Sequence, residues 1–341
     1  MQTAPAGGKP IKTGKLAPGP GASFLSIAES NDARRQTHMY DVIVAGGGPA
    51  GLTAALYAAR AGRSVLALEQ ASPGGQILYS PLVENYPGLP AMRGAQFSEQ
   101  LTDQVEALGV EIAYAAVLGF RPDQPGYAVQ TEDGTYHGRT LVLAPGSSHR
   151  RLGLLGEEAL TGRGVSYCAV CDGPFYRGKA VAVVGGGDTA LQEALFLSSV
   201  CQHVTLVHRR PQFRGAAQLV QRLEERDNVE IRLGWTPDAF VQQEGVLTGL
   251  RLRQTGGAQT CELDVDGVFL AVGQIPGTGP FVGQIPVDEH GYFRAGEDCR
   301  TCLPGVFVAG DCRTKTVRQL ATAIADGAVA GLAAAEFAEA N

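Results

Sequence analysis

The 341-residue chain exceeds the roughly 250–300 residues over which a single hydrophobic core grows, so its length favours two domains. Its net charge of −6 at pH 7, without a long basic run, disfavours a nucleic-acid-binding surface. The sequence has no run of apolar residues long enough to predict a membrane span. Seven cysteines are few for this length and odd in number, so we expect a reducing, cytoplasmic setting.

The N-terminal residues 1–38 differ in composition from the rest. They are rich in Gly, Pro and small residues and have no regular hydrophobic period, so we expect a disordered extension. No apolar segment here is long enough for a signal peptide. Acidic residues are absent before Glu29, which leaves a transit peptide or an added leader open.

One structural unit occurs twice in the remaining sequence. The segment "YDVIVAGGGPAGLTAALYAARAGRSVLALEQ" predicts a strand, a Gly-rich turn, a helix and a second strand, and "KAVAVVGGGDTALQEALFLSSVCQHVTLVHRR" repeats this order. The first glycine of the turn and the last residue of the second strand are equally far apart in both units. The sequence therefore predicts an α/β protein with two Rossmann-like dinucleotide-binding domains.

The first unit has a GxGxxG pattern between a strand and a helix. Its glycines serve the turn, the approach of backbone to a pyrophosphate, and helix–strand packing, and the phosphates lie at the helix N-terminus. Glu69 is suited to accept hydrogen bonds from ribose hydroxyls of an adenosine without a 2′-phosphate. The residues predicted to bind this dinucleotide are Gly46, Gly48, Pro49, Ala50, Gly51 and Glu69.

The second unit has the permitted variant GxGxxA, because Ala190 replaces the third glycine. Its second strand ends in "HRRPQFR" instead of an acid. Two arginine bonds to a 2′-phosphate, of roughly 1.5–3 kcal/mol each, favour NADPH over NADH by roughly 10²- to 10⁴-fold. A solvated basic strand end is the alternative. The residues predicted to bind NADPH are Gly185, Gly187, Asp188, Thr189, His208, Arg209, Arg210 and Arg214.

The segment "CAVCDG" places Cys168 two residues before Cys171, with Asp172 directly behind. If NADPH occupies the second unit, FAD in the first would pass electrons to a Cys168–Cys171 disulfide. A zinc site is the alternative, because "CRTC" supplies another cysteine pair, but the pairs lie too far apart in sequence for a typical zinc clip. We therefore predict no metal. The cysteines interpreted as packing or incidental thiols are Cys201, Cys261, Cys299, Cys302 and Cys312.

Together these motifs resemble those of the low-molecular-weight, bacterial-type thioredoxin reductases. The resemblance covers residues 39–341 and rests on GGGPAG, "PGGQ", "ENYPG", "CAVCDG", GGGDTA, "HRRPQFR" and "GVFVAGDCRTKTVRQLATA" in this order. It implies FAD and NADPH as cofactors, thioredoxin as partner, and a homodimer without nucleic-acid or membrane partners. It also implies flavin contacts at Gly75, Gln76, Asn85, Gly310, Asp311, Arg318, Gln319 and Leu320.

The resemblance further implies that the NADPH domain is inserted into a discontinuous FAD domain. We expect the FAD domain at residues 39–150 and 274–341 and the NADPH domain at 151–273. Both are expected to be three-layer domains of the ββα type, with parallel sheets. Since the dithiol would lie on the NADPH domain, the domains must rotate between half-reactions, with hinges near "PGSSHRRLGLLGEE" and "AVGQIPGTGP".

By the same resemblance, Cys171 lies nearer the flavin and Cys168 exchanges with the partner disulfide. Asp172 would carry protons to and from the pair, the alternative being a helix N-cap. Two residues depart from the family pattern. Pro145 in "LVLAPGSS" puts in doubt a turn of the flavin domain, and Pro174 predicts a stiffer loop after the dithiol.

The sequence thus favours an NADPH-dependent thioredoxin-disulfide reductase. A relative taking electrons from ferredoxin or another donor would not need the basic cluster. A reductase of a glutaredoxin-like or peroxiredoxin partner also stays open. We expect no N-terminal thioredoxin-like domain in this sequence, which disfavours a self-contained peroxide-reducing system. A flavin-dependent redox sensor would differ from all of these by lacking sustained turnover.

Overall fold

The computed structural model describes residues 37–80 and 82–341. The described elements lie in residues 39–341, which form a unit separate from residues 1–38. The disordered extension expected at residues 1–38 therefore falls almost wholly outside the described residues.

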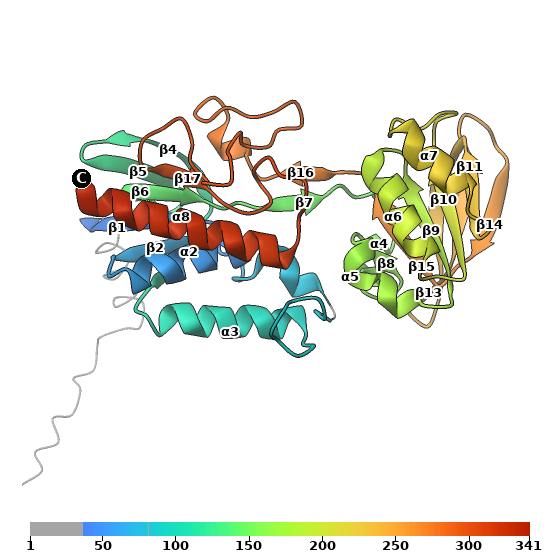
Figure 1. Cartoon of the computed structure of the whole chain (residues 1–341), viewed down its shortest axis with the longest axis horizontal. Helices are drawn as coiled ribbons and strands as arrows, with labels where there is room; N and C mark the ends of the chain where they lie inside the picture. Colours follow the sequence, from blue (N-terminus) through green and yellow to red (C-terminus); the bar gives the residue numbers. More distant parts are fainter. Residues whose placement is uncertain (1–36, 81) are drawn as a thin grey trace, which may run out of the picture. The chain divides into compact units, whose positions relative to one another are not determined.

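The first glycine-rich unit lies in a seven-stranded sheet of order β3-β2-β1-β6-β5-β4, with β17 also paired to β6 (Figure 1). Its strands are β1 (Met39–Ala45), β2 (Val65–Glu69), β3 (Glu111–Tyr114), β4 (Val117–Asp123), β5 (Gly126–Thr131), β6 (Thr135–Leu143) and β17 (Val306–Val308). Strand β5 pairs antiparallel with both β4 and β6, and the remaining pairs are parallel. The first half of β6 pairs with β5 and its second half with β17, so the end of the chain returns to this sheet.

Helices α2 (Pro49–Arg60), α3 (Gly94–Glu106) and α8 (Leu320–Ala340) share a buried core with this sheet. Helices α2 and α8 pack closely, since a Cβ on Gly327 or Gly331 would collide with a backbone carbonyl of α2. By length and composition, α8 is the one helix among the described residues that could cross a membrane, which is weak evidence. One face of α8 consists mainly of buried Gly and Ala residues, and this face packs against α2 as in a core helix.

The second glycine-rich unit lies in a five-stranded parallel sheet of order β11-β10-β9-β15-β8 (Figure 1). Its strands are β8 (Val165–Ser166), β9 (Ala180–Gly185), β10 (His203–His208), β11 (Val229–Leu233) and β15 (Gly267–Ala271). One face packs on α6 (Asp188–Ser198) and α7 (Ala217–Glu224). The other packs on an antiparallel sheet of β12 (Trp235–Gln243), β13 (Val246–Gln254) and β14 (Thr260–Asp264).

Strand β9 explains this layering, because its side chains alternate between the two faces. Val181 and Val183 enter the helix-side core, while Ala182 and Val184 enter the core beneath the antiparallel sheet. The prediction of an α/β fold with two Rossmann-like, three-layer nucleotide-binding domains is confirmed. The residue boundaries of those domains stay a prediction.

Two short strands, β7 (Ser147–His149) and β16 (Gln274–Pro276), pair antiparallel where the chain passes from the first sheet to the second and back (Figure 1). They fall within the two segments predicted to be hinges. The remaining short elements are α4 (Glu157–Leu160), α5 (Ala169–Asp172), η1 (Gly75–Tyr79), η2 (Gly173–Tyr176) and η3 (Gly279–Phe281).

Candidate redox-active site

Cys168 and Cys171 are joined by a disulfide, with their Cα atoms 5.3 Å apart. Cys168 directly precedes the short helix α5, and its Sγ accepts a 3.2 Å hydrogen bond from the Cys171 N–H. Both cysteines are half-buried, and Val170 between them is 48% exposed. The predicted redox pair is therefore formed as a disulfide whose two cysteines are partly buried, next to an exposed Val170.

Asp172 lies directly behind the disulfide. Its Oδ2 accepts a 2.6 Å hydrogen bond from the Ser166 hydroxyl, which itself accepts a 3.1 Å bond from the Cys168 N–H. Burial raises the pKa of Asp172, and the bond from Ser166 partly opposes this rise. Asp172 occupies the N-cap position of η2, but its side chain makes no capping bond, which contradicts the capping alternative. A carboxyl in this setting can hold a proton beside the disulfide.

Tyr167, the residue before Cys168, is held from two sides. Its hydroxyl donates a 2.7 Å hydrogen bond to Glu157, and its ring stacks on His149 with centroids 4.7 Å apart. The buried Glu157 carboxylate also accepts backbone bonds from the linker, one of 2.8 Å from the Gly153 N–H. No motif in the sequence indicated Ser166, Glu157 or these ring contacts, because the contacts form only when the chain folds back on itself.

The turn between β1 and α2 has the shape that a dinucleotide requires. A Cβ on Gly46 would collide with the backbone carbonyl that follows β6, and one on Gly51 would collide with the Gly46 carbonyl. A Cβ on Gly48 would meet no atom of the described residues within 4 Å, so the backbone there is open to a ligand. Glu69 lies beneath the turn and accepts a 2.7 Å hydrogen bond from the Gly47 N–H. Pro49 and Ala50 begin α2 at this turn.

Distant segments meet beside this first turn. Asn85 Nδ2 donates a 3.2 Å hydrogen bond to Gln319 Oε1, and a Cβ on Gly75 would lie 3.4 Å from the Gly48 Cα. Asp311 is mostly buried, burial raises its pKa, and its Oδ1 has no hydrogen-bond partner among the described residues. A buried carboxyl oxygen without a donor fits a ligand hydroxyl, such as those of a ribityl chain. These residues therefore fit a flavin dinucleotide.

The last predicted flavin residues lie around the start of α8. Arg318 donates a 3.3 Å hydrogen bond to the Asp311 carbonyl, and its guanidinium lies 4.0 Å from the centre of the Tyr292 ring. Gln319 is the N-cap of α8 in a capping box, and Leu320 is the first helical residue. Gly310 follows β17 directly after Ala309, and Gln76 is exposed in η1.

The turn between β9 and α6 repeats the geometry of the first. A Cβ on Gly185 would collide with the backbone carbonyl at the end of β15, whereas one on Gly187 would have no neighbour within 4 Å in the part of the chain that the structure describes. His208 lies beneath Gly186 as Glu69 lies beneath Gly47, since a Cβ on Gly186 would collide with the imidazole. Asp188 and Thr189, both exposed, begin α6.

The basic cluster divides into a buried and an exposed part. Arg209, Arg210 and Arg214 are exposed beyond β10, and the Arg214 N–H donates a 2.8 Å bond to the Gly186 carbonyl, which folds this segment onto the turn. His208 is buried, and burial together with the neighbouring arginines lowers its pKa. The exposed arginines therefore supply the positive charge near this turn, while the imidazole stays neutral at pH 7.

The other cysteines are free thiols. Burial raises the pKa of Cys201 to about 11 and the pKa of Cys299 and Cys312 to about 12, so these thiols are poor nucleophiles. Cys299 Sγ faces the Asp326 carbonyl at 3.6 Å, whereas Cys302 is exposed. Within residues 37–80 and 82–341, no group of three or more His, Cys, Asp or Glu could hold a metal ion.

The two departures from the family pattern fit their surroundings. Pro174 lies in the first turn of η2, where its fixed φ suits a helical start. Pro145 packs against Gly277, where an added Cβ would lie 2.8 Å from the Pro145 carbonyl. The segment after Pro145 still pairs, because the Gly146 carbonyl accepts a 2.9 Å bond from the Gly277 N–H.

Two glycine-rich nucleotide turns and a partly buried disulfide with an acid behind it define a dinucleotide-dependent disulfide oxidoreductase. A family model described as pyridine nucleotide-disulphide oxidoreductase matches residues 40–327. The chain belongs to this family, as a thioredoxin reductase of the low-molecular-weight type. The resemblance found in the motifs is thereby confirmed, and the family implies a flavin and a pyridine nucleotide as cofactors.

Curated relatives and solved structures agree on this membership. The chain is 40% identical to a thioredoxin reductase of Listeria monocytogenes over 301 residues, or 88% of this chain and 94% of the relative. A thioredoxin reductase of Bacillus subtilis is 36% identical over 301 residues, or 88% and 95%. The thioredoxin reductase structure from Streptococcus pyogenes is 38% identical, with a TM-score of 0.85 over 89% of this chain and 99% of that one.

Proposed function

We propose that this chain reduces the disulfide of thioredoxin with electrons from NADPH, through an FAD bound at the first glycine-rich turn. The observation that carries the proposal is the partly buried Cys168–Cys171 disulfide with Asp172 behind it, in a fold with two nucleotide turns. The relatives named as thioredoxin reductases support thioredoxin as the partner. A homodimer and a cytoplasmic location belong to the same proposal.

Bound FAD would supply a two-electron carrier between the nicotinamide and the disulfide. The open backbone at Gly48 and the unpartnered Asp311 oxygen support its binding at the first turn, with Arg318 and Gln319 beside it. The arginines beyond β10 support NADPH at the second turn, because a guanidinium pairs with a 2′-phosphate. This basic cluster favours NADPH over a ferredoxin-type donor.

Reduction of the Cys168–Cys171 disulfide takes up two electrons and two protons and yields two thiols. Asp172, whose pKa is raised, can hold one of these protons beside the sulfur atoms and return it to solvent. With its proton removed, the Cys168 thiolate attacks one sulfur of the partner disulfide, which forms a mixed disulfide and releases a partner thiolate. Attack by Cys171 on that bond restores the internal disulfide, and the partner leaves with both electrons.

We further propose that the FAD domain, at residues 39–150 and 274–341, and the NADPH domain, at 151–273, rotate relative to one another about β7 and β16. Two solved thioredoxin reductases support such rotation in the family. The structures from Streptococcus pyogenes and Lactococcus lactis are 38% and 36% identical to the chain, yet their TM-scores are 0.85 and 0.62 over the same 89% of it. A crosslink between the domains that left turnover intact would refute the rotation.

The proposed function is tested anaerobically on the yellow protein, by adding NADPH or NADH and following the flavin absorbance, then adding oxidised thioredoxin. We expect rapid bleaching by NADPH and recovery of colour on adding thioredoxin. Bleaching by neither nucleotide would favour another electron donor. Bleaching without recovery would favour a glutaredoxin-like or peroxiredoxin partner, or a sensor without turnover.

Two cysteine variants make this test specific. Cys168→Ser should lose thioredoxin reduction by about 10³-fold or more, because a hydroxyl cannot exchange with a disulfide, while NADPH still bleaches the flavin. Cys302→Ser, at an exposed free thiol, is the matched control and should keep full turnover.

A further inference from the structure

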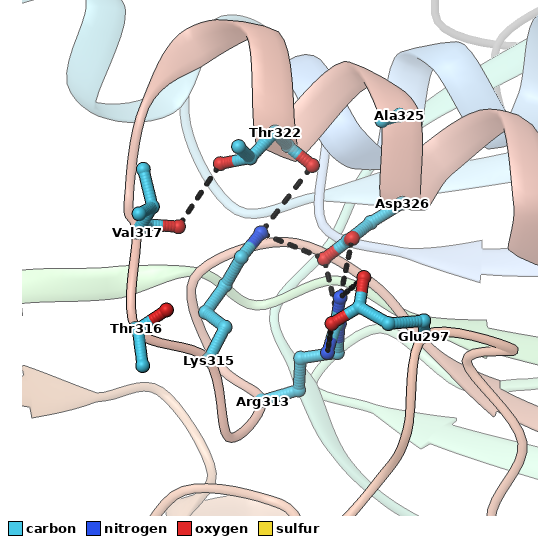
Figure 2. A pocket seen from close by; sticks show the side chains of 8 residues that line it. All are labelled: Glu297, Arg313, Lys315, Thr316, Val317, Thr322, Ala325 and Asp326. Carbon is cyan, nitrogen blue, oxygen red and sulfur yellow. Dashed lines mark hydrogen bonds and ion pairs between the residues drawn. The ribbon is translucent and has the colours of Figure 1, made fainter.

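A buried ion cluster lies between the loop that follows β17 and helix α8 (Figure 2). We call Asp326, Arg313, Lys315 and Glu297 the Asp326 cluster; its residues line a cavity of about 220 Å³. Asp326 comes from α8, and the two cations come from the loop. The sequence carried one signal for it, since Asp326 is a lone acid within the apolar run "LATAIADGAVAGLAAA".

The Asp326 carboxylate is fully engaged by this loop. Its Oδ1 accepts a 2.7 Å hydrogen bond from Arg313 Nη2. Its Oδ2 accepts bonds from Arg313 Nε at 2.8 Å, from Lys315 Nζ at 2.9 Å and from the Gly310 N–H at 2.9 Å. The side chains of Asp326 and Lys315 are each 5% exposed, and that of Arg313 is 1% exposed.

The cluster keeps its charge despite being buried. Burial alone would raise the pKa of Asp326, but the hydrogen bonds from Arg313 and Lys315 outweigh it and lower that pKa. The Glu297 carboxylate, 90% exposed, lies 3.1 Å from Arg313 at the rim. Removing the Asp326 charge would therefore leave two buried cations with little compensation, and they would move toward water or new partners.

These bonds connect the start and the middle of the loop to α8. Gly310 is its first residue, so its bond to Asp326 fixes the position of the following Asp311. Lys315 also donates a 3.3 Å bond to the Thr322 carbonyl in the first turn of α8, and the Arg313 carbonyl accepts a 3.3 Å bond from Arg318. The loop thus has one arrangement relative to the helix while Asp326 is charged.

We propose that Asp326 is a positioning residue for the flavin, which acts through Gly310, Arg313 and Lys315 on the loop of residues 310–319. That loop carries four of the predicted flavin contacts, which are Gly310, Asp311, Arg318 and Gln319. The inference rests on the FAD site proposed above. It adds Asp326 to the flavin site as a residue that does not contact the flavin but holds the predicted flavin contacts in position.

A positioning role and a purely structural role have different thermodynamic signatures. A carboxylate that only stabilised the fold would lower the melting temperatures of flavin-free and flavin-loaded protein together. A positioning residue also lowers the affinity for FAD, and ligand binding stabilises the folded state in proportion to that affinity. Its loss therefore narrows the gap between the two melting temperatures.

The test compares Asp326→Asn with Glu339→Gln. Both convert a carboxylate on α8 to an amide, but Glu339 is 72% exposed and pairs with Arg63 at 2.7 Å, away from the loop. FAD is titrated into the flavin-free proteins, and the melting temperature and the visible circular dichroism of the flavin are recorded. For Asp326→Asn we expect the Kd for FAD to rise by about tenfold or more and the dichroism to change. Glu339→Gln should match the wild type.

Lys315→Met is the second variant, because it keeps the Arg313 fork and the Gly310 bond and disturbs the fold less. We expect a rise in its Kd for FAD of about threefold or more. An unchanged Kd and dichroism in Asp326→Asn, or in Lys315→Met where the first variant does not fold, would overturn the inference. Failure of wild type and Glu339→Gln to bind FAD would instead refute the proposed function itself.

Discussion

The Ser166 hydroxyl and the Asp172 carboxyl form a 2.6 Å hydrogen bond beside the Cys168–Cys171 disulfide. The same hydroxyl oxygen accepts the Cys168 N–H at 3.1 Å. One serine therefore connects the proposed proton carrier to the backbone of the exchanging cysteine. Because the bond stabilises the ionised carboxyl, it limits the rise in the pKa of Asp172 that burial causes.

Ser166→Ala should raise the pKa of Asp172 further, since burial would then act without that bond. A hydrogen bond worth about 0.5–1.5 kcal/mol corresponds to a shift of up to about one pH unit. The protonated carboxyl would persist to higher pH, so the alkaline limb of the single-turnover rate of disulfide reduction should move upward. Ser199→Ala, at an exposed serine bonded to a helix carbonyl, should leave the profile unchanged. An unshifted limb in Ser166→Ala would argue against Asp172 as the proton carrier.

Gly187→Ala should weaken NADPH binding without lowering the thermal stability of the protein. The backbone at Gly187 is extended, and among residues 37–80 and 82–341 the new Cβ would meet no atom within 4 Å, so the variant should melt at or slightly above the wild-type temperature. The methyl group would occupy the approach to a pyrophosphate, so the KM for NADPH should rise about tenfold or more with FAD content unchanged.

Gly185→Ala provides the contrast, because its Cβ would collide with the backbone carbonyl at the end of β15. This variant should lose stability and soluble yield, whereas Gly187→Ala should not. Thermal unfolding and NADPH steady-state kinetics check both. Equal instability in the two variants, or an unchanged KM in Gly187→Ala, would contradict the assignment of this turn.

Arg210→Gln combined with Arg214→Gln should reduce the preference for NADPH. Each lost charge-assisted bond is worth about 1.5–3 kcal/mol, so the KM for NADPH should rise by about 10²-fold or more while that for NADH changes little. Arg226→Gln removes an exposed arginine elsewhere in the same part of the chain and serves as the control. A parallel loss with both nucleotides would point to a structural effect instead of 2′-phosphate recognition.

Glu193 should make stability depend on pH. It lies on α6, accepts the Ala169 N–H, and burial raises its pKa from 4.5 to about 7, while its Oε2 has no hydrogen-bond partner among the described residues. Between about pH 4.5 and pH 7, the Glu193 carboxyl keeps its proton in the folded protein and loses it in the unfolded chain. The resulting stability is therefore complete below about pH 4.5 and disappears as pH rises through about 7.

Glu193→Gln should accordingly raise the free energy of unfolding at pH 8, by up to about 3 kcal/mol, and change it little at pH 5. Glu224→Gln, at an exposed position on α7, should show no such pH dependence. Denaturant unfolding at the two pH values measures the difference. Parallel changes at pH 5 and pH 8 would contradict a buried, protonated Glu193.

The glycine-rich turns were predictable because their requirements are local. A turn that joins a strand to a helix, leaves backbone open at Gly48 and Gly187, and packs tightly at Gly46 and Gly185 needs glycine at fixed spacing. The disulfide was equally accessible to prediction, because Cys168 and Cys171 are neighbours on one short helical turn.

Residues that act through hydrogen bonds or ring contacts formed by the folded chain were not predicted. Ser166 contacts Asp172 because the chain turns between β8 and α5, and His149 contacts Tyr167 across the linker that follows β7. The prediction also grouped His208 with the arginines. The structure separates them, because His208 ends a buried strand and fills the space under Gly186.

The sequence by itself determined the two nucleotide-binding units, the redox cysteines and the family, since each depends on the order of neighbouring residues. Only the tertiary structure decided that Asp326 hydrogen-bonds the loop that begins at Gly310. It likewise decided that Asn85 hydrogen-bonds Gln319, which is 234 residues away in the sequence. Side chains are buried, paired and shifted in pKa by whatever the folded chain brings beside them. That proximity depends on packing between distant segments, which sequence spacing does not encode.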